Sequence, residues 1–138
     1  MDLQLTEKVA LVSGSTAGIG LAIATTLAQE EATVIINGRT PERVKTAIDQ
    51  IKQKVPNAEL QGVVADLGTV EGANVLFQQA PDVDILVNNL GIYGAKDFAE
   101  ISDEEWMTFL EVNVMSGVRL SRFYLPKMLQ KNWGRIIF

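Results

Sequence analysis

Residues 9–20 of the sequence read VALVSGSTAGIG, and the fold follows from this stretch. The apolar run Val9–Val12 has the length of a buried strand and stops at Ser13. Apolar residues then recur at helical spacing from Ile19 to Leu27, which predicts an amphipathic helix. A glycine-rich turn between a strand and a helix lets a ligand approach the backbone, and the helix start offers free N–H groups to a diphosphate. An ordinary glycine turn is the alternative.

Strand-length runs alternate with helical segments along the rest of the chain. The further apolar runs are Thr33–Ile36, Leu60–Ala65, Val83–Val87 and Arg135–Phe138. The further helices are one capped by Thr40 with Pro41 first and ending before Val55-Pro56, one near Val70–Gln79, and a long one from the Ser102–Glu105 capping box to Gly134. The apolar members of the long helix include Trp106, Phe109, Leu110, Val114, Val118, Phe123 and Leu129.

This alternation predicts an α/β fold, with helices on both faces of a parallel sheet and right-handed crossovers. We expect residues 1–138 to form one nucleotide-binding domain, a doubly wound sheet of the Rossmann type that is truncated in its fifth strand. Ligands of such sheets bind beyond the carboxyl ends of the strands.

The composition excludes several kinds of chemistry. The 138 residues contain no cysteine and no histidine, which excludes disulfides, thiolate nucleophiles and a Ser-His-Asp triad and removes the usual zinc ligands, so no metal is expected. A net charge of −5 without a basic run argues against nucleic acid and anionic membrane partners. No apolar run approaches the roughly 20 residues of a membrane span, and the polar N-terminus does not resemble a signal peptide. We therefore expect a cytoplasmic protein.

Four motifs lie at the places where such a sheet binds its ligand. They are Gly14-x-x-x-Gly18-Ile19-Gly20 after the first strand, Asp66 after the third, Asn88-Asn89-x-Gly91 after the fourth, and Asn113 in the long helix. With these motifs in this order, the chain resembles the short-chain dehydrogenase/reductase family from about Lys8 to Phe138. Two positions depart from the family pattern: Ser13 replaces a usual threonine, and Leu90 replaces a usual alanine, so a larger side chain must fit beside the cofactor.

The resemblance implies a role for each residue. The residues expected around the diphosphate and the adenosine ribose are Gly14, Ser15, Thr16, Gly18, Ile19 and Gly20. Those expected along the adenine and its ribose are Asp66, Leu67, Asn89 and Gly91, while Asn88 would brace the sheet. Val112 would lie near the nicotinamide ribose, and Asn113 would be a catalytic residue of the proton relay. A helix cap stays open as an alternative for Asp66, and a tolerated polar residue within a helix for Asn113.

The turn after the second strand bears on the choice of cofactor. An acidic residue there would bind the ribose hydroxyls of NAD(H), but the chain has Gly38 at that position and Arg39 next. A guanidinium matches a phosphate group in a fork geometry. The prediction is NADP(H) rather than NAD(H), with a solvated surface arginine as the alternative.

The family transfers hydride between nicotinamide and a carbonyl or alcohol, using a serine and a Tyr-x-x-x-Lys pair. The tyrosines here are Tyr93 and Tyr124, and the residues four positions later are Asp97 and Met128 rather than lysine. We therefore expect these 138 residues to be inactive alone and to be the N-terminal half of an NADP(H)-dependent oxidoreductase. By resemblance, the full-length protein would act on a small carbonyl or alcohol substrate as a homodimer or homotetramer. The alternative is a non-catalytic nucleotide-binding or interaction module.

Overall fold

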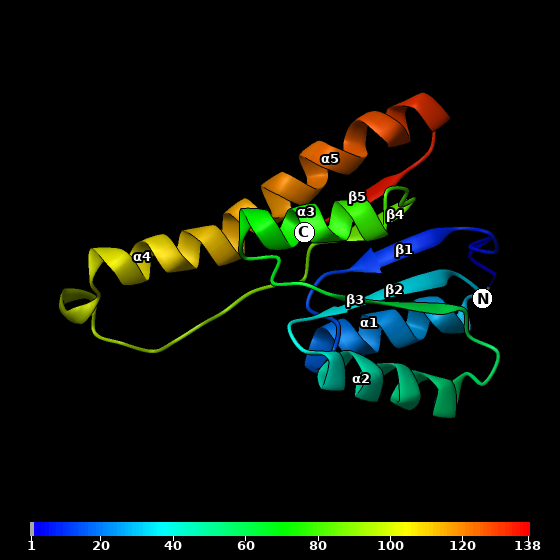
Figure 1. Cartoon of the computed structure of the whole chain (residues 1–138), viewed down its shortest axis with the longest axis horizontal. Helices are drawn as coiled ribbons and strands as arrows, with labels where there is room; N and C mark the ends of the chain where they lie inside the picture. The colour runs from blue at the N-terminus through cyan, green and yellow to red at the C-terminus, as the bar shows by residue number, and fades with distance from the viewer. Residues whose placement is uncertain (1) are drawn as a thin grey trace.

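The computed structural model describes residues 2–138 and contains one parallel five-stranded sheet in the order β3-β2-β1-β4-β5 (Figure 1). The strands are β1 (Val9–Val12), β2 (Thr33–Gly38), β3 (Leu60–Val64), β4 (Ile85–Val87) and β5 (Arg135–Ile137). The helices are α1 (Gly18–Gln29), α2 (Pro41–Lys54), α3 (Val70–Gln79), α4 (Asp103–Leu110) and α5 (Ser116–Lys131), with a 3-10 turn at Phe98–Glu100 and a π-helix at Glu111–Met115. The predicted alternation of strands and helices is confirmed, with strand edges shifted by one or two residues.

The register of the sheet brings the ends of its central strands together. Val12 is level with Ile36 on one side and with Val87 on the other. The segments that follow β1, β2 and β4 therefore leave the sheet at the same edge. The strand order also reverses at β1, because β2 and β4 flank it, and this is the topological switch point where doubly wound sheets bind their ligands.

Successive residues of a strand point to opposite faces of the sheet, and each face has its own hydrophobic core. Ala10 and Val12 pack in a core with residues of α1 and α2, whereas Leu11 between them packs in a core with residues of α3 and α5. Because both faces are covered, the central strands are apolar at nearly every position, as buried parallel strands are. The continuous apolar runs in the sequence have this physical cause.

The long helix differs from the prediction at its middle and at its end. The π-helix Glu111–Met115 interrupts it, so α4 and α5 are separate α-helical segments of one continuous rod. The expected stop at Gly134 is wrong: Asn132 ends the helix in a left-handed conformation, with φ at 54°. Asparagine tolerates this conformation better than most residues. Gly134 is needed instead for space, since a Cβ there would lie 2.5 Å from the side chain of Met128.

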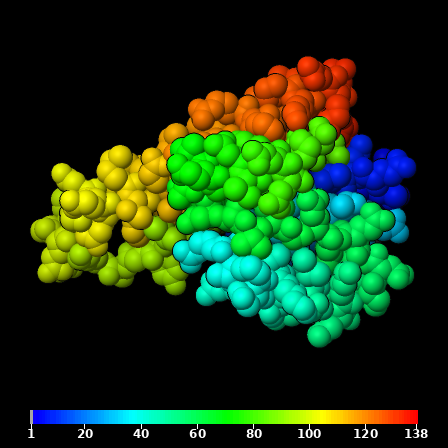
Figure 2. Space-filling model, viewed as in Figure 1, coloured from blue at the N-terminus to red at the C-terminus, as the bar shows by residue number. Residues whose placement is uncertain are grey.

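The face that α5 buries also differs from the prediction. Its fully buried large side chains are Leu120 and Tyr124, with Met128 one turn further on. Most of the predicted apolar stripe is instead 38–65% exposed, namely Trp106, Leu110, Val114, Val118 and Leu129. The rod carries α4 away from the sheet, together with the loop that follows β4 (Figures 1 and 2). In the part of the chain that the structure describes, no helix combines the length and apolarity needed to cross a membrane.

Candidate functional site

A cavity of about 370 Å³ opens at the carboxyl edge of the sheet. The predicted site residues that line it are Gly14, Thr16, Arg39, Asp66, Leu67, Gly91 and Val112. Gly38 and Leu90, which the sequence placed near the cofactor, also line it. The lining residues that sequence reasoning did not assign to the site are Asn37, Arg43, Ala65, Ile92 and Thr108. The structure thus brings together segments that follow β1, β2, β3 and β4, and we refer to this cavity as the cleft.

Six of the predicted site residues are not among those that line the cleft. They are Ser15, Gly18, Ile19, Gly20, Asn89 and Asn113. Gly18 and Ile19 form the exposed start of α1, and the Ile19 side chain is 76% exposed. The side chain of Ser15 is fully buried, and its Oγ accepts a hydrogen bond from the Asn37 backbone N–H at 2.9 Å. The Ser15 hydroxyl therefore braces the loop, while its part in cofactor binding stays a prediction.

The glycines of the loop after β1 and of the first turn of α1 meet different physical requirements. Gly14 and Gly18 have φ of +62° and +56°, which side chains disfavour. A Cβ on Gly18 would meet nothing within 4 Å, so the space in front of this residue is open. A Cβ on Gly20 would lie 2.5 Å from the carbonyl oxygen of Gly14 and from Nδ2 of Asn89. The loop can therefore lie directly on the first turn of α1 while its outer side stays accessible.

Asn89 and Ser13 join the loop after β1 to the segment after β4. The Asn89 Nδ2 donates to the carbonyls of Ser13 and Gly14, at 3.0 and 3.1 Å. The Ser13 Oγ accepts from the backbone N–H groups of Asn89 and Leu90, both at 3.0 Å. Because a hydroxyl is what this position needs, serine performs the same task as the usual threonine. Leu90 packs over Gly14 and lines the cleft, so its larger side chain does reach the site.

Asn37 is a site residue that sequence reasoning missed. It is buried at the end of β2, where its Oδ1 accepts from the Gly14 N–H at 3.0 Å. Its Nδ2 donates to the carbonyls of Val63 and Ala65, at 3.3 and 3.1 Å. One amide thus connects the loop after β1 with β2 and β3. The signal in the sequence was a polar residue that directly extends a buried apolar run.

Asn113 lies in the π-helix and holds the segment after β4. Its Oδ1 accepts from the Ile92 N–H, and its Nδ2 donates to the Ile92 carbonyl. Single-turn π segments within α-helices often occur at functional sites. Asn113 therefore has a specific partner across the site, which argues against a polar residue merely tolerated within a helix.

Asp66 forms the turn that leads from β3 into α3. Its Oδ1 accepts from the Gly68 N–H at 3.0 Å, while its side chain remains exposed at the cleft. The cap of α3 is Thr69, whose hydroxyl oxygen accepts from the Gly72 N–H at 3.0 Å. The helix-cap alternative for Asp66 is therefore wrong.

Two cationic side chains line the cleft at the end of β2. Arg39 follows Gly38 directly, and Arg43 lies in the first turn of α2, where Thr40 caps the helix. Within residues 2–138, neither guanidinium forms an ion pair with a carboxylate. The N-terminus of α2 also carries the partial positive charge of the helix dipole. This part of the cleft can therefore attract an anionic group.

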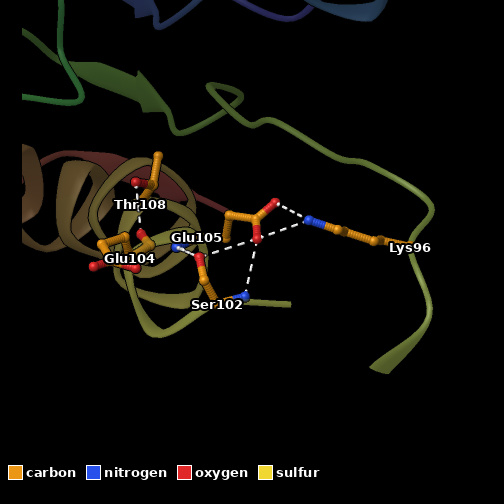
Figure 3. A network of polar contacts seen from close by, with 5 residues as sticks. All are labelled: Lys96, Ser102, Glu104, Glu105 and Thr108. Atoms are coloured by element: carbon orange, nitrogen blue, oxygen red, sulfur yellow. Dashed lines mark hydrogen bonds and ion pairs between the residues drawn. The ribbon is translucent and has the colours of Figure 1, made fainter. Parts of the chain in front are cut away.

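The loop after β4 has a second anchor on α4 (Figure 3). Lys96 Nζ donates to both carboxylate oxygens of Glu105, at 2.9 and 3.0 Å. The same carboxylate accepts from the N–H and hydroxyl of Ser102, which completes the predicted capping box. The hydrogen bond from the Ser102 N–H, with those from Lys96 and the Ser102 hydroxyl, lowers the pKa of Glu105 to about 2. Next to this network lies a cavity of about 400 Å³, with Gly94, Trp106 and Phe109 among its walls.

A switch-point cleft bounded by a glycine loop at a helix start defines a dinucleotide-binding α/β domain of the Rossmann type. Residues 8–138 match the family described as short chain dehydrogenase, and the chain belongs to that family. The resemblance inferred from the sequence motifs is thereby confirmed.

Relatives and solved structures agree with this assignment over nearly the whole chain. An uncharacterized oxidoreductase of Bacillus subtilis, YvaG, is 56% identical over 138 residues, which is 100% of this chain and 52% of the relative. The 3-oxoacyl-[acyl-carrier-protein] reductase FabG of Aquifex aeolicus is 39% identical, over 99% of this chain and 56% of its own length. L-sorbose reductase of Gluconobacter frateurii, solved with NADPH and L-sorbose, superposes with a TM-score of 0.89 at 35% identity, over 99% of this chain and 53% of that structure. The chain thus spans about half the length of the relatives it matches.

Proposed function

We propose that the full-length protein is an NADP(H)-dependent oxidoreductase that transfers hydride between nicotinamide and a carbonyl or alcohol group of a small molecule. The observation that carries the choice of cofactor is the pair of unpaired guanidiniums, Arg39 and Arg43, beside a glycine at the end of β2. A phosphate on the adenosine ribose would find charge-assisted donors there. An NAD(H) site would instead need a carboxylate, and position 38 carries no side chain.

The residues of the chain fit a dinucleotide. The open space before Gly18 and the free N–H groups at the start of α1 suit a diphosphate, beside Gly14, Thr16 and Ile19. Asp66 and Leu67 would hold the adenine, and Gly91 would line the adenosine side, with Asn89 holding the backbone beneath it. Val112 and Asn113 would border the nicotinamide ribose. The bound nicotinamide would supply the hydride chemistry, while these residues bind and orient it.

The comparisons support this proposal through proteins of related sequence. The Gluconobacter reductase was solved with NADPH. A protein of Beutenbergia cavernae that is 39% identical and assigned as an NAD(P)-dependent gluconate 5-dehydrogenase was solved with NADP at low occupancy. Both similarities cover at least 96% of this chain. We also propose that the full-length protein forms a homodimer or homotetramer. The exposed apolar side chains along α4 and α5 support this assembly, since extended apolar surface is typical of interfaces.

Titration of the full-length protein with NADPH and with NADH by calorimetry tests the cofactor. A charged hydrogen bond contributes about 1.5–3 kcal/mol, so NADPH is expected to bind roughly 10–150 times more tightly than NADH. Oxidation of NADPH over a panel of ketones, aldehydes and ketoacyl thioesters tests the reaction. Equal affinity for the two cofactors would contradict the NADP(H) assignment, and cofactor binding without turnover of any carbonyl would favour a non-catalytic module.

A further inference from the structure

Gly38, the position where an NAD(H) site would need a carboxylate, is enclosed by a residue from the glycine loop. Gly38 is the last residue of β2 and does not have a positive φ, so its backbone conformation permits a side chain. The space around Gly38, however, does not permit a side chain. A Cβ at this position would overlap the Cγ2 methyl group of Thr16 and would lie 3.1 Å from Cγ2 of Val44.

The two terminal atoms of the Thr16 side chain, Cγ2 and Oγ1, differ in their distance from this added Cβ. The Thr16 Oγ1 would lie 3.5 Å from the added Cβ, which is an ordinary van der Waals distance. Of these two atoms, only the methyl group overlaps the added Cβ. Serine at position 16 would therefore retain the hydroxyl and remove the obstacle.

We propose that Thr16 is a specificity-determining residue, because its methyl group keeps the end of β2 free of a side chain and so excludes the carboxylate that an NAD(H) site needs. The inference rests on the NADP(H) function proposed above. Two features of the chain would then contribute to cofactor choice in different ways. Arg39 and Arg43 attract a phosphate, and Thr16 prevents the acidic alternative from arising by a single substitution at position 38.

The steric part is tested first, without cofactor, by thermal unfolding of the full-length protein. Gly38→Ala is expected to lower Tm by about 2–12 °C, the range for overpacking a buried position. In the Thr16→Ser background most of this loss should disappear. Gly62→Ala is the matched control: its Cβ would lie 2.6 Å from Val44 and does not involve Thr16, so Thr16→Ser should not rescue it. Additive effects of Thr16→Ser and Gly38→Ala on Tm would overturn the proposed contact.

The specificity part is tested by calorimetric titration of the same full-length protein with NADH and NADPH. Gly38→Asp alone is expected to weaken binding of both cofactors. Thr16→Ser/Gly38→Asp is expected to raise the affinity for NADH, relative to that for NADPH, by roughly tenfold or more over Gly38→Asp alone. If Gly38→Asp alone gives the full change of preference, Thr16 does not determine specificity. If instead the unmodified protein binds both cofactors equally, the proposed function fails, while the thermal coupling of Thr16 and Gly38 remains a separate result.

Discussion

Asn113 satisfies both backbone polar groups of Ile92: it accepts from the Ile92 N–H at 2.7 Å and donates to the Ile92 carbonyl at 2.9 Å. This reciprocal pair ties the loop after β4 to the π-helix, and Ile92 lines the cleft. One side chain thus sets the position of a wall of the proposed cofactor site.

In the full-length protein, if it has the proposed activity, Asn113→Ala is expected to lower kcat by about 100-fold or more, the range for loss of a group that takes part in proton transfer. The bonded groups are exposed, so the cost in stability is expected to be only about 1 kcal/mol. Steady-state kinetics with NADPH and thermal unfolding measure the two effects separately. Asn113→Asp retains the acceptor for Ile92 and loses the donor, so it should fall between the parent and Asn113→Ala. Full turnover by the alanine variant would remove Asn113 from the mechanism.

Arg39 is expected to account for most of the preference for NADPH. Arg39→Ala should weaken NADPH binding by about 1.5–3 kcal/mol, or roughly 10–150-fold, because a charged hydrogen bond to phosphate is lost. Binding of NADH should change little. Arg43→Ala should act in the same direction but less strongly, since its guanidinium comes from the helix beyond the turn. Arg122→Ala, an exposed arginine of α5 outside the cleft, is the control. Equal loss of both cofactors in Arg39→Ala would make Arg39 an ordinary surface residue.

Two glycines at the start of α1 are expected to separate cofactor binding from stability. Gly18→Val would place a branched side chain in the open space before α1, where the diphosphate is proposed to lie. NADPH binding should be lost while the fold is retained, at a cost of about 1–2 kcal/mol for the left-handed backbone. Gly20→Ala should destabilise the fold itself by about 1–3 kcal/mol, because its Cβ would meet the Gly14 carbonyl. Unchanged NADPH affinity in Gly18→Val, measured by calorimetry, would show that the loop does not hold the phosphates.

Local interactions explain why most of the fold could be predicted. The strand runs, the Thr40 cap and the Ser102–Glu105 capping box each depend on residues within a few positions of one another. The site depends on pairings across the chain, such as Asn37 with Gly14 and Asn113 with Ile92, each more than 20 positions apart. Periodicity cannot reveal such pairings. It also misplaced the buried face of the long helix, because the π-helix interrupts the α-helical repeat between α4 and α5 and exposed apolar residues occur along both segments.

The network around Glu105 should weaken in acid. Its pKa lies near 2 in the folded chain, below the ordinary value of 4.5, chiefly because the Ser102 N–H donates to the carboxylate. Since the folded value is the lower one, the stabilisation is present above pH 4.5 and is lost as the pH falls towards 2. NMR titration of Glu105, with hydrogen exchange of residues 96–105, measures both effects.

Glu105→Gln should remove this pH dependence, because its amide does not ionise. Glu104→Gln is the matched control. In the described network, the Glu104 backbone carbonyl accepts from the Thr108 hydroxyl, whereas Lys96 contacts the carboxylate of Glu105. The exchange rates of residues 96–105 are corrected for the intrinsic effect of pH on exchange. If the corrected rates stay constant between pH 4.5 and 2, the proposed role of Glu105 is excluded.

Residues 1–138 expressed alone are expected to show no dehydrogenase activity. Proton transfer to a carbonyl oxygen needs a positioned donor of suitable pKa. Tyr124 is fully buried and donates its hydroxyl to the Ala80 carbonyl at 2.7 Å, and burial raises its pKa well above the ordinary value. Tyr93 is 97% exposed, is not among the residues that line the cleft, and has Asp97 rather than lysine four positions later. Neither tyrosine can therefore serve as the assisted acid.

The same 138 residues are also expected to associate in solution. Within residues 2–138, β5 pairs only with β4, and Phe138 beyond it is 80% exposed. An open strand edge beside apolar side chains recruits other chains. Weak NADPH binding should persist, because Arg39, Arg43 and the glycine loop are all present. Size-exclusion chromatography with light scattering, followed by NADPH oxidation over a carbonyl panel, tests both expectations, with the full-length protein as the positive control. A monomer of residues 1–138 that turns over a carbonyl would mean that the active site is built from other residues than those proposed here.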